Sequence, residues 1–502
     1  MWKLRRTFWN WLSILKFRAN KARPVPEPTQ DRRRIVAIPL EKRYPSIPIS
    51  RIPVADHAPP DESMRARLLF CKVQAWLYRR FPPTQPGLPE IDRDPRAAVA
   101  GAYTVGHRKC LPAPVLPEEY EDPVDLGQLA VAGPYACYLQ GAADGEFEWD
   151  LRFLDGYEHH GGLRSLGARV AFRADEDQQR LSAVEIDCEL GVCKPGEPEW
   201  ADAQRIALCA ATNHLSLVRH FNWVHLTAVS NFAIATRHNL PAGHEVRRIL
   251  WPHMWGTHYS NELVTEILLM KGGDFESVFS FSHAGLCRLF EDSYDQYDVR
   301  VIDPMADAER RGVLKGGFAL PYLDNRQAHF DVMHAHARRY LRLYYASDDD
   351  LRGDASVQAW VDELGQRIPN GVRGVLGDDV TIDGVARLVA GFIYLGSVEH
   401  EVLGTRLWNY QVWPQVQPTR IYRSGRRESI DVYQRLVNYN FILNVRRTPL
   451  CGDFSHMSRD PVGQQAFRTF LAELNTLQEK LDAEDDAYWK VSPKILESGV
   501  NG

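Results

Sequence analysis

Long stretches with apolar residues at helical spacing occupy the chain from Trp200 to its end, and they constrain the fold more than any other feature. Proline and glycine fall mostly at the joints between them. Together the stretches predict a mainly α fold, in which residues 199–502 form one large domain with long core helices. The stretches are 201–238, 257–271, 326–346, 356–366, 382–410, 428–446 and 463–484.

The first 198 residues have a less regular pattern. Residues 1–60 are basic and amphipathic at first and then rich in proline, so we expect an arm that runs extended over the surface. Residues 61–198 are expected to form an irregular N-terminal part that packs on the core. Within it, 164–190 contains two short strand-like runs around a polar turn.

The charge distribution excludes one class of partner. The chain of 502 residues has a net charge of −5, but residues 1–34 alone carry ten Lys/Arg and two acidic residues, which is +8 and leaves −13 for the remainder. We therefore expect no nucleic-acid partner. The eight cysteines form no CxxC pair, so neither a disulfide scaffold nor a zinc knuckle is indicated.

Residues 1–20 combine Trp, Phe, Leu and Ile side chains with five Lys/Arg. One interpretation is a basic amphipathic helix that makes peripheral contact with a membrane surface. The alternative is a helix packed on the body of the protein, or a frayed terminus. The apolar part is short and no small-residue cleavage site follows it, so we expect a cytoplasmic protein with membrane association rather than a secreted one.

Two histidines, His220 and His225, lie inside an otherwise apolar predicted helix. Seven of the seventeen histidines fall between residues 214 and 258, and buried imidazoles need partners for their nitrogens. A spacing of five places two side chains ~140° apart on a regular α-helix, so a shared ligand requires a local π-bulge. The alternatives are a metal site and separate core histidines that each bond a backbone carbonyl.

A third histidine, His400, lies in another apolar stretch, between Glu399 and Glu401. Ionisable residues in such surroundings are either paired or functional. Two or three imidazoles with a carboxylate and open positions are a common arrangement for non-haem iron. His400 therefore either completes a metal site or lies on a helix surface beside two solvated glutamates.

The order of several phrases resembles the lipoxygenase family. The two histidines are followed by FAIATRHNL (232–240), then by His244 and LWPH (250–253), and later by YYASDDDLRGDASVQAWVDEL (344–364). The resemblance covers about residues 200–502 and implies a lipoxygenase-like catalytic domain. It also implies iron ligation by His220, His225 and His400. His244 and His253 occupy family-like positions that are not ligands, so we expect structural roles for them.

The last ten residues continue the resemblance. In lipoxygenases the free carboxylate of the last residue binds the iron, and a proline lies nine residues before it. Pro493 and Gly502 have this spacing. The resemblance thus implies Gly502 as a further metal ligand.

Three positions depart from the family pattern. Gly404 stands where the family has a further Asn or His ligand, and Gly502 replaces the terminal isoleucine. Val264 stands at the position associated with oxygen-insertion geometry, where a small residue is usual. Asn409 would compensate for the missing ligand only if its helix were distorted, and otherwise it is an amide in a cap or turn.

The resemblance implies an oxidoreductase that adds O2 to a polyunsaturated fatty acid or a similar apolar chain, after hydrogen abstraction from a bis-allylic carbon. The expected cofactor is non-haem iron, and manganese accepts the same donors. Gly404 favours an alternative, in which the same architecture converts a hydroperoxide or oxygenates a specialised metabolite. A third hypothesis is a catalytically silent lipid-binding protein.

Overall fold

The computed structural model describes residues 4, 5, 7–9, 11, 12, 24–63, 65–81, 124–143, 146–175, 179–406, 410, 416–425, 448–485, 487 and 489–500. The architecture of these residues is mainly helical, as the sequence predicts. No helix among them combines the length and apolar character that crossing a bilayer requires.

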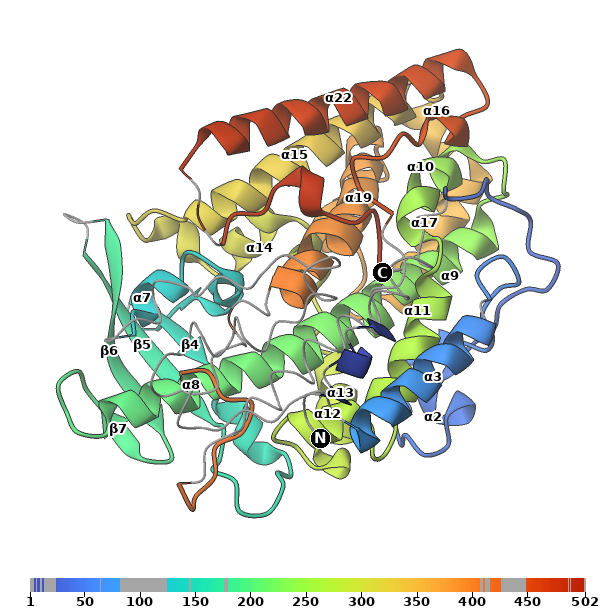
Figure 1. Cartoon of the computed structure of the whole chain (residues 1–502). Helices are drawn as coiled ribbons and strands as arrows, with labels where there is room; N and C mark the ends of the chain where they lie inside the picture. Colours follow the sequence, from blue (N-terminus) through green and yellow to red (C-terminus); the bar gives the residue numbers. More distant parts are fainter. Residues whose placement is uncertain are drawn as a thin grey trace.

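One continuous helical column forms the axis of the fold. It consists of α8 (Trp200–His214), the π-helix η4 (Leu215–Val229) and α9 (Ser230–Asn239). Figure 1 shows this column running through the molecule from the strands toward the opposite side. The prediction of a helix over 201–238 is confirmed. Its π-helical part extends over fifteen residues, whereas the histidine spacing required only a local bulge.

A second column lies against the first and carries its own widened turns. It begins with α19 (Ile382–Tyr394), whose N-cap Thr381 accepts a hydrogen bond from the Gly384 amide. The π-helices η8 (Leu395–Glu399) and η9 (Val402–Arg406) continue it and contact η4. Almost every side chain of α19 is buried, which explains its continuous apolar sequence.

Two long helices cover the outside of α19. α15 (Pro321–Leu341) packs on α19, and α22 (Pro461–Ala483) packs on α15; Figure 1 shows these layers. α15 begins and ends five residues earlier than the predicted stretch 326–346, and Pro321 takes its first helical position. The predicted stretch 428–446 lies outside the described residues.

The remaining α- and π-helices connect and surround these columns. They are α2 (Leu40–Arg43), α3 (Arg65–Arg80), α7 (Leu126–Leu129), α10 (Glu245–Met254), α11 (Thr257–Val264), η5 (Thr265–Leu269), α12 (Asp274–Val278), α13 (His283–Tyr294), α14 (Pro304–Arg310), α16 (Asp348–Arg352), α17 (Ala355–Arg367) and α18 (Arg373–Leu376). Short 3₁₀ segments join them at η2 (Pro134–Tyr138), η3 (Arg152–Gly156), η6 (Val299–Ile302), η7 (Val313–Lys315), η10 (Ser455–Met457) and η11 (Pro493–Ile495).

A five-stranded antiparallel sheet packs against α8. Its strands follow the chain in the order β3-β4-β5-β6-β7, and the inward residues of β5, such as Val170 and Phe172, are buried. The hairpin of β5 and β6 confirms the two strand-like runs predicted within 164–190. The strands are β3 (Gln140–Gly141), β4 (Phe147–Asp150), β5 (Ala168–Asp175), β6 (Arg180–Cys188) and β7 (Gly191–Cys193).

The N-terminal arm is fastened to α9. Its strands β1 (Ala37–Pro39) and β2 (Pro53–Ala55) pair antiparallel. The fully buried guanidinium of Arg237 forms ion pairs with Asp31 at 2.6 Å and with Glu62 at 2.6 Å. These contacts hold the arm on the helical core. The expected domain limits, 1–60, 61–198 and 199–502, stay a prediction.

Candidate metal centre

Three histidines from the two helical columns meet in the core. His220 and His225 lie on η4, and His400 follows directly after η8. Their ring centroids are 5.0 Å apart for His220–His225, 5.1 Å for His220–His400 and 4.9 Å for His225–His400. One nitrogen from each ring lies within 4.8 Å of the other two. This clustering excludes the alternative of separate core histidines.

The π-helical backbone explains how the spacing of five brings two rings together. Hydrogen bonding from i to i+5 widens the turn, so residues five apart come to nearly the same face. His400 also lies between two π-helical segments, η8 and η9. The sequence gives no spacing signal for this second widening, since a single histidine has no partner on its own helix.

All three rings are buried and uncharged. Burial is the main cause that lowers the pKa of each imidazole, to about 4 for His225 and well below the usual value for His220 and His400. The neighbouring rings add to the effect at His220 and His400. A neutral imidazole keeps a lone pair, which is the form that binds a metal.

The hydrogen bonds of the cluster leave nitrogens without protein partners. His225 Nδ1 donates to Asn261 Oδ1 at 3.3 Å. The proton of the neutral ring is therefore on Nδ1, and Nε2 carries the free lone pair. That Nε2 lies 3.2 Å from His400 Nε2. Among the described residues, His220 Nε2 and His400 Nδ1 have no hydrogen-bond partner. Buried nitrogens of this kind cost stability unless something binds them, so the residues present fit a divalent cation.

Asn261 on α11 fixes the orientation of His225 through two contacts. Its Oδ1 accepts from His225 Nδ1, and its Nδ2 donates to the His225 carbonyl oxygen at 2.8 Å. No spacing in the sequence signals this contact, because His225 and Asn261 lie 36 residues apart on different helices. Val264 is buried one helical turn after Asn261, at a spacing that places both residues on one side of α11.

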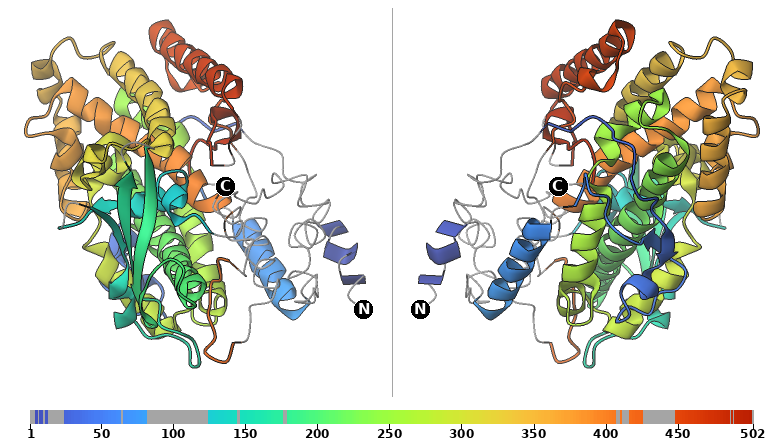
Figure 2. Two further views of the ribbon diagram at one scale, coloured as in Figure 1. Left: turned by 90° about the vertical axis from the view of Figure 1, so that its left-hand side faces the viewer. Right: turned by 90° about the vertical axis from the view of Figure 1, so that its right-hand side faces the viewer.

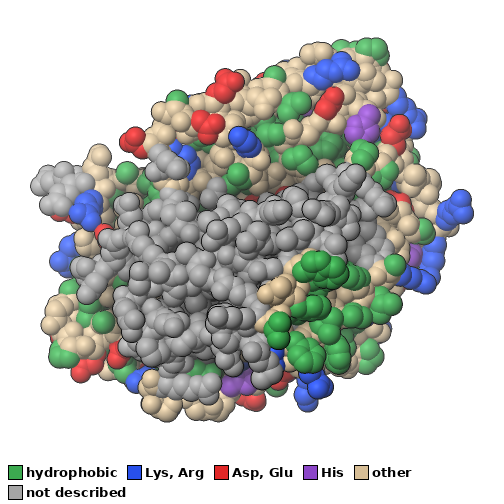
Figure 3. Space-filling model, viewed as in Figure 1, with side chains coloured by type: hydrophobic (Ala, Val, Ile, Leu, Met, Phe, Trp, Pro, Cys, Tyr) green, Lys and Arg blue, Asp and Glu red, His purple; other side chains and the backbone are tan. Residues whose placement is uncertain are grey.

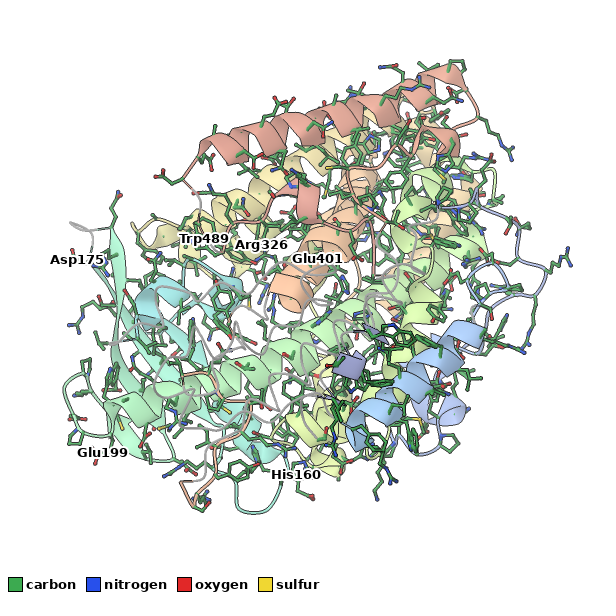
Figure 4. The ribbon with its side chains drawn as sticks, in the orientation of Figure 1. His160, Asp175, Glu199, Arg326, Glu401 and Trp489 are labelled. Carbon is green, nitrogen blue, oxygen red and sulfur yellow. The ribbon has the colours of Figure 1, made fainter. Side chains whose placement is uncertain are left out.

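Buried charges lie next to two of the histidines. Glu399 accepts from Arg326 Nη2 at 2.6 Å and from the Tyr394 hydroxyl at 3.2 Å, and it lies 3.6 Å from Arg219 Nη2. Figure 4 shows Arg326 on α15 and Glu401 near the end of the second column. Glu399 and Glu401 are both 3% exposed. The alternative of a surface histidine beside two solvated glutamates is therefore wrong.

Position 404 borders the cluster. A Cβ atom at Gly404 would lie 3.2 Å from His220 Cε1 and 3.6 Å from His220 Nε2. A larger side chain there would thus reach toward the same space as the imidazole nitrogens. Gly404 itself contributes no side-chain donor there. Asn409, the residue considered as a substitute, lies outside the described residues.

The C-terminal segment approaches the second column. His253 Nδ1 donates to the Ser498 carbonyl oxygen at 2.6 Å, and Val500 is 1% exposed. A Cβ atom at Gly396 on η8 would lie 3.6 Å from the Cα atom of Gly499. The tail is therefore packed, as far as residue 500, against the turn that precedes His400. Gly502 itself lies outside the described residues.

The other family-like histidines support the backbone and the core. His244 accepts the Val246 amide at the start of α10 and contacts Asp354 at 3.1 Å. His253 holds the tail, as described above. His336 on α15 is fully buried, and its ring stacks on Phe470 with 4.2 Å between centroids.

Comparison with known proteins identifies the family of the chain. A family model described as Lipoxygenase matches residues 152–439. The chain is 26% identical over 253 residues to a linoleate 9/13-lipoxygenase of Pseudomonas aeruginosa, covering 46% of this chain and 35% of that protein. It is 22% identical over 242 residues to a manganese lipoxygenase of Pleurotus sapidus, covering 47% and 37%. In each case the match spans little more than a third of the relative.

Solved structures share the fold over most of the chain. A calcium-dependent 11R-lipoxygenase superposes with a TM-score of 0.74 at 16% identity, covering 98% of this chain and 80% of that one. A coral 8R-lipoxygenase superposes with a TM-score of 0.72 at 14% identity, covering 92% and 80%. At these identities the likeness establishes the fold alone.

Proposed function

The chain belongs to the lipoxygenase family, and we propose that it is a non-haem iron dioxygenase that adds O2 to a polyunsaturated fatty acid or a similar apolar chain. The observation that carries this proposal is the meeting of three buried, neutral imidazoles from two helices. Relatives named for linoleate and for polyunsaturated fatty acids support the substrate class. Abstraction of hydrogen from a bis-allylic carbon is part of the proposal.

His220, His225 and His400 would hold the metal, and the carboxylate of Gly502 is the proposed further donor. When bound, iron would supply one-electron oxidation and reduction at the substrate carbon. Manganese suits the same donors, and one relative is named a manganese lipoxygenase.

The surrounding side chains pack on the rings and hold them. Phe221 stacks on His225 with 5.5 Å between centroids and packs against Phe275 at 4.4 Å. Asn261 orients His225 through the two hydrogen bonds described above. Under this proposal, aromatic side chains packed on fixed rings protect a carbon radical from side reactions and help to fix the position of the reacting C–H bond.

Metal analysis of the purified protein combined with oxygen uptake on linoleate tests the proposal. We expect one iron per chain, together with oxygen consumption and the absorbance of a conjugated diene. His225→Ala should lose both metal and activity. His456→Ala is the matched control, because His456 is exposed and its ring contacts the Val25 carbonyl oxygen instead of the cluster.

Gly404 favours a second candidate within the same fold. The space beside His220 Nε2 that the glycine leaves suits water or a polar group of a substrate, for instance a hydroperoxide. Under this hypothesis the protein binds iron and consumes no oxygen with linoleate, but converts a linoleate hydroperoxide.

A silent lipid-binding protein is the least favoured hypothesis. Among the described residues, two of the three buried histidines, His220 and His400, have a ring nitrogen without a hydrogen-bond partner, which destabilises a fold that has no use for them. Absence of bound metal after purification with iron or manganese supplied would support the silent protein and contradict both enzyme proposals.

A further inference from the structure

The helix α3 exposes four large apolar side chains and buries a cysteine, a glutamine and an alanine. Leu69, Phe70, Val73 and Trp76 are 44–64% exposed, at a spacing that places them on one side of the helix. The opposite side, which packs on the core, contains Cys71, Gln74 and Ala75. This orientation is the reverse of that expected for a helix on the surface of a protein in water.

Residues of the N-terminal segment extend this surface. The Trp9 indole is buried and donates to the Phe81 carbonyl oxygen at 2.6 Å, just after the end of α3. Around it, Leu4 is 76%, Phe8 43% and Trp11 59% exposed. Figure 2 shows the N-terminal residues beside α3 on one flank of the molecule.

We call this surface the apolar face. It comprises Leu4, Phe8, Trp11, Leu69, Phe70, Val73, Trp76 and Phe81, each at least 43% exposed. Figure 3 shows hydrophobic side chains gathered over α3. Contiguous apolar surface of this kind marks a binding site for a protein or a membrane.

The charge of residues 1–20 and 65–80 favours a membrane over a protein partner. Residues 65–80 contain five Lys/Arg and no acidic residue, and residues 1–20 have the same composition of charges. The remainder of the chain has an excess of acidic residues, since the whole chain has a net charge of −5. Exposed Arg80 lies over the Trp76 ring at 5.8 Å. Tryptophan, phenylalanine and leucine bordered by cations suit the interface of an anionic bilayer.

We infer that the apolar face binds the surface of a membrane that contains anionic phospholipids, with α3 lying parallel to the bilayer plane. The apolar side chains enter the boundary between headgroups and acyl chains, and Arg65 and Arg80 contact the phosphates. The membrane contact predicted for residues 1–20 thereby extends to α3. This inference does not depend on the metal or on the proposed reaction.

Sedimentation of the full chain with vesicles tests the inference. The vesicles contain either phosphatidylcholine alone or phosphatidylcholine and phosphatidylserine in equal parts. We expect binding to the mixed vesicles that weakens with salt, and weaker binding to phosphatidylcholine alone. The double variant Leu69→Ser/Trp76→Ser should bind more than roughly tenfold more weakly.

A matched control replaces two equally exposed apolar residues elsewhere. Val192 on β7 and Val462 on α22 are 55% and 61% exposed, so Val192→Ser/Val462→Ser should bind as the wild type does. The variant Arg65→Gln/Arg80→Gln leaves the apolar side chains in place. It should lower the affinity for the mixed vesicles roughly 25-fold, because each of the two cations near an anionic surface contributes about fivefold.

Three results would overturn the inference. The first is wild-type protein that does not sediment with mixed vesicles. The second is Leu69→Ser/Trp76→Ser protein that binds as well as the Val192→Ser/Val462→Ser control. The third is a wild-type dimer in the absence of lipid that the Leu69→Ser/Trp76→Ser variant converts to a monomer, because the face would then be covered by a second copy of the chain. None of these outcomes bears on metal content or oxygen uptake.

Discussion

Arg219 and Glu399 form a buried ion pair, with 3.6 Å between Nη2 and Oε1, and each residue directly precedes one of the clustered histidines. The pair therefore joins the two helical columns at the level of His220 and His400. Arg326 shares the same carboxylate, so Glu399 balances two buried cations. Its charge fixes the relative position of the two columns.

Glu399→Gln should weaken metal binding and the fold together. Two arginines would be left buried without a balancing charge, which costs about 3–5 kcal/mol of unfolding free energy, and we expect metal affinity to fall at least roughly tenfold. Chelator competition and urea unfolding measure the two effects. Glu473→Gln is the control, because its pair with Arg339 is one-third exposed and contributes only about 0–1 kcal/mol. Unchanged metal affinity in a folded Glu399→Gln protein would contradict this role.

Asn261→Ala should lower metal affinity by about tenfold or more while leaving the protein folded. The variant removes the acceptor for His225 Nδ1 and the donor to the His225 carbonyl oxygen, so the ring loses its fixed orientation. Asn231→Ala is a control on the same helical column, since that amide donates to the Thr227 carbonyl oxygen at 2.7 Å. Chelator competition distinguishes the two variants; an equal loss of affinity in both would show that the effect is general destabilisation.

The sequence predicted the mainly helical fold and singled out three histidines that the structure brings together, but it did not predict the contacts that support these histidines. Apolar periodicity predicts α22, whose buried residues lie on one helix face, and a continuous apolar run predicts α19, which is buried on nearly all sides. The length of η4 and the widening around His400 depend on packing between columns, which no single segment encodes. The pair of Arg219 and Glu399 joins residues far apart in the chain, so only the folded structure shows that the charges meet.

Gly404→Asn should raise iron affinity relative to Gly404→Ala. Both variants place a Cβ atom 3.2 Å from His220 Cε1, so both shift that ring slightly, but only asparagine adds a donor. An additional ligand should raise iron affinity by roughly tenfold. If the missing ligand at position 404 limits the reaction, oxygen uptake on linoleate should also increase in Gly404→Asn. Equal affinities for the two variants would mean that position 404 does not direct a side chain at the metal.

Acid should remove the stabilisation that Glu363 provides. Burial acts to raise the pKa of this carboxyl, but hydrogen bonds from His238, Arg367 and Asn239 outweigh it and lower the pKa to about 2 from 4.5. A depressed pKa stabilises the folded state above pH 4.5, and the stabilisation is lost as the pH falls from there toward about 2. Glu363→Gln should cost about 2 kcal/mol at neutral pH, and its urea midpoint should converge with that of the wild type in acid. A difference that stays constant with pH would contradict the mechanism.

One alanine added after Gly502 should reduce metal affinity without unfolding the protein. The addition moves the terminal carboxylate by about 3.5 Å along the chain, which is too far for a metal–oxygen bond of about 2 Å. The contacts that hold the tail as far as residue 500 would remain, because His253 still donates to the Ser498 carbonyl oxygen. The control is Gly502→Ala, which keeps the carboxylate in place and should bind metal as the wild type does. If the extended chain retains its metal with unchanged affinity, the carboxylate of Gly502 is not a ligand, and the three histidines bind the metal without it.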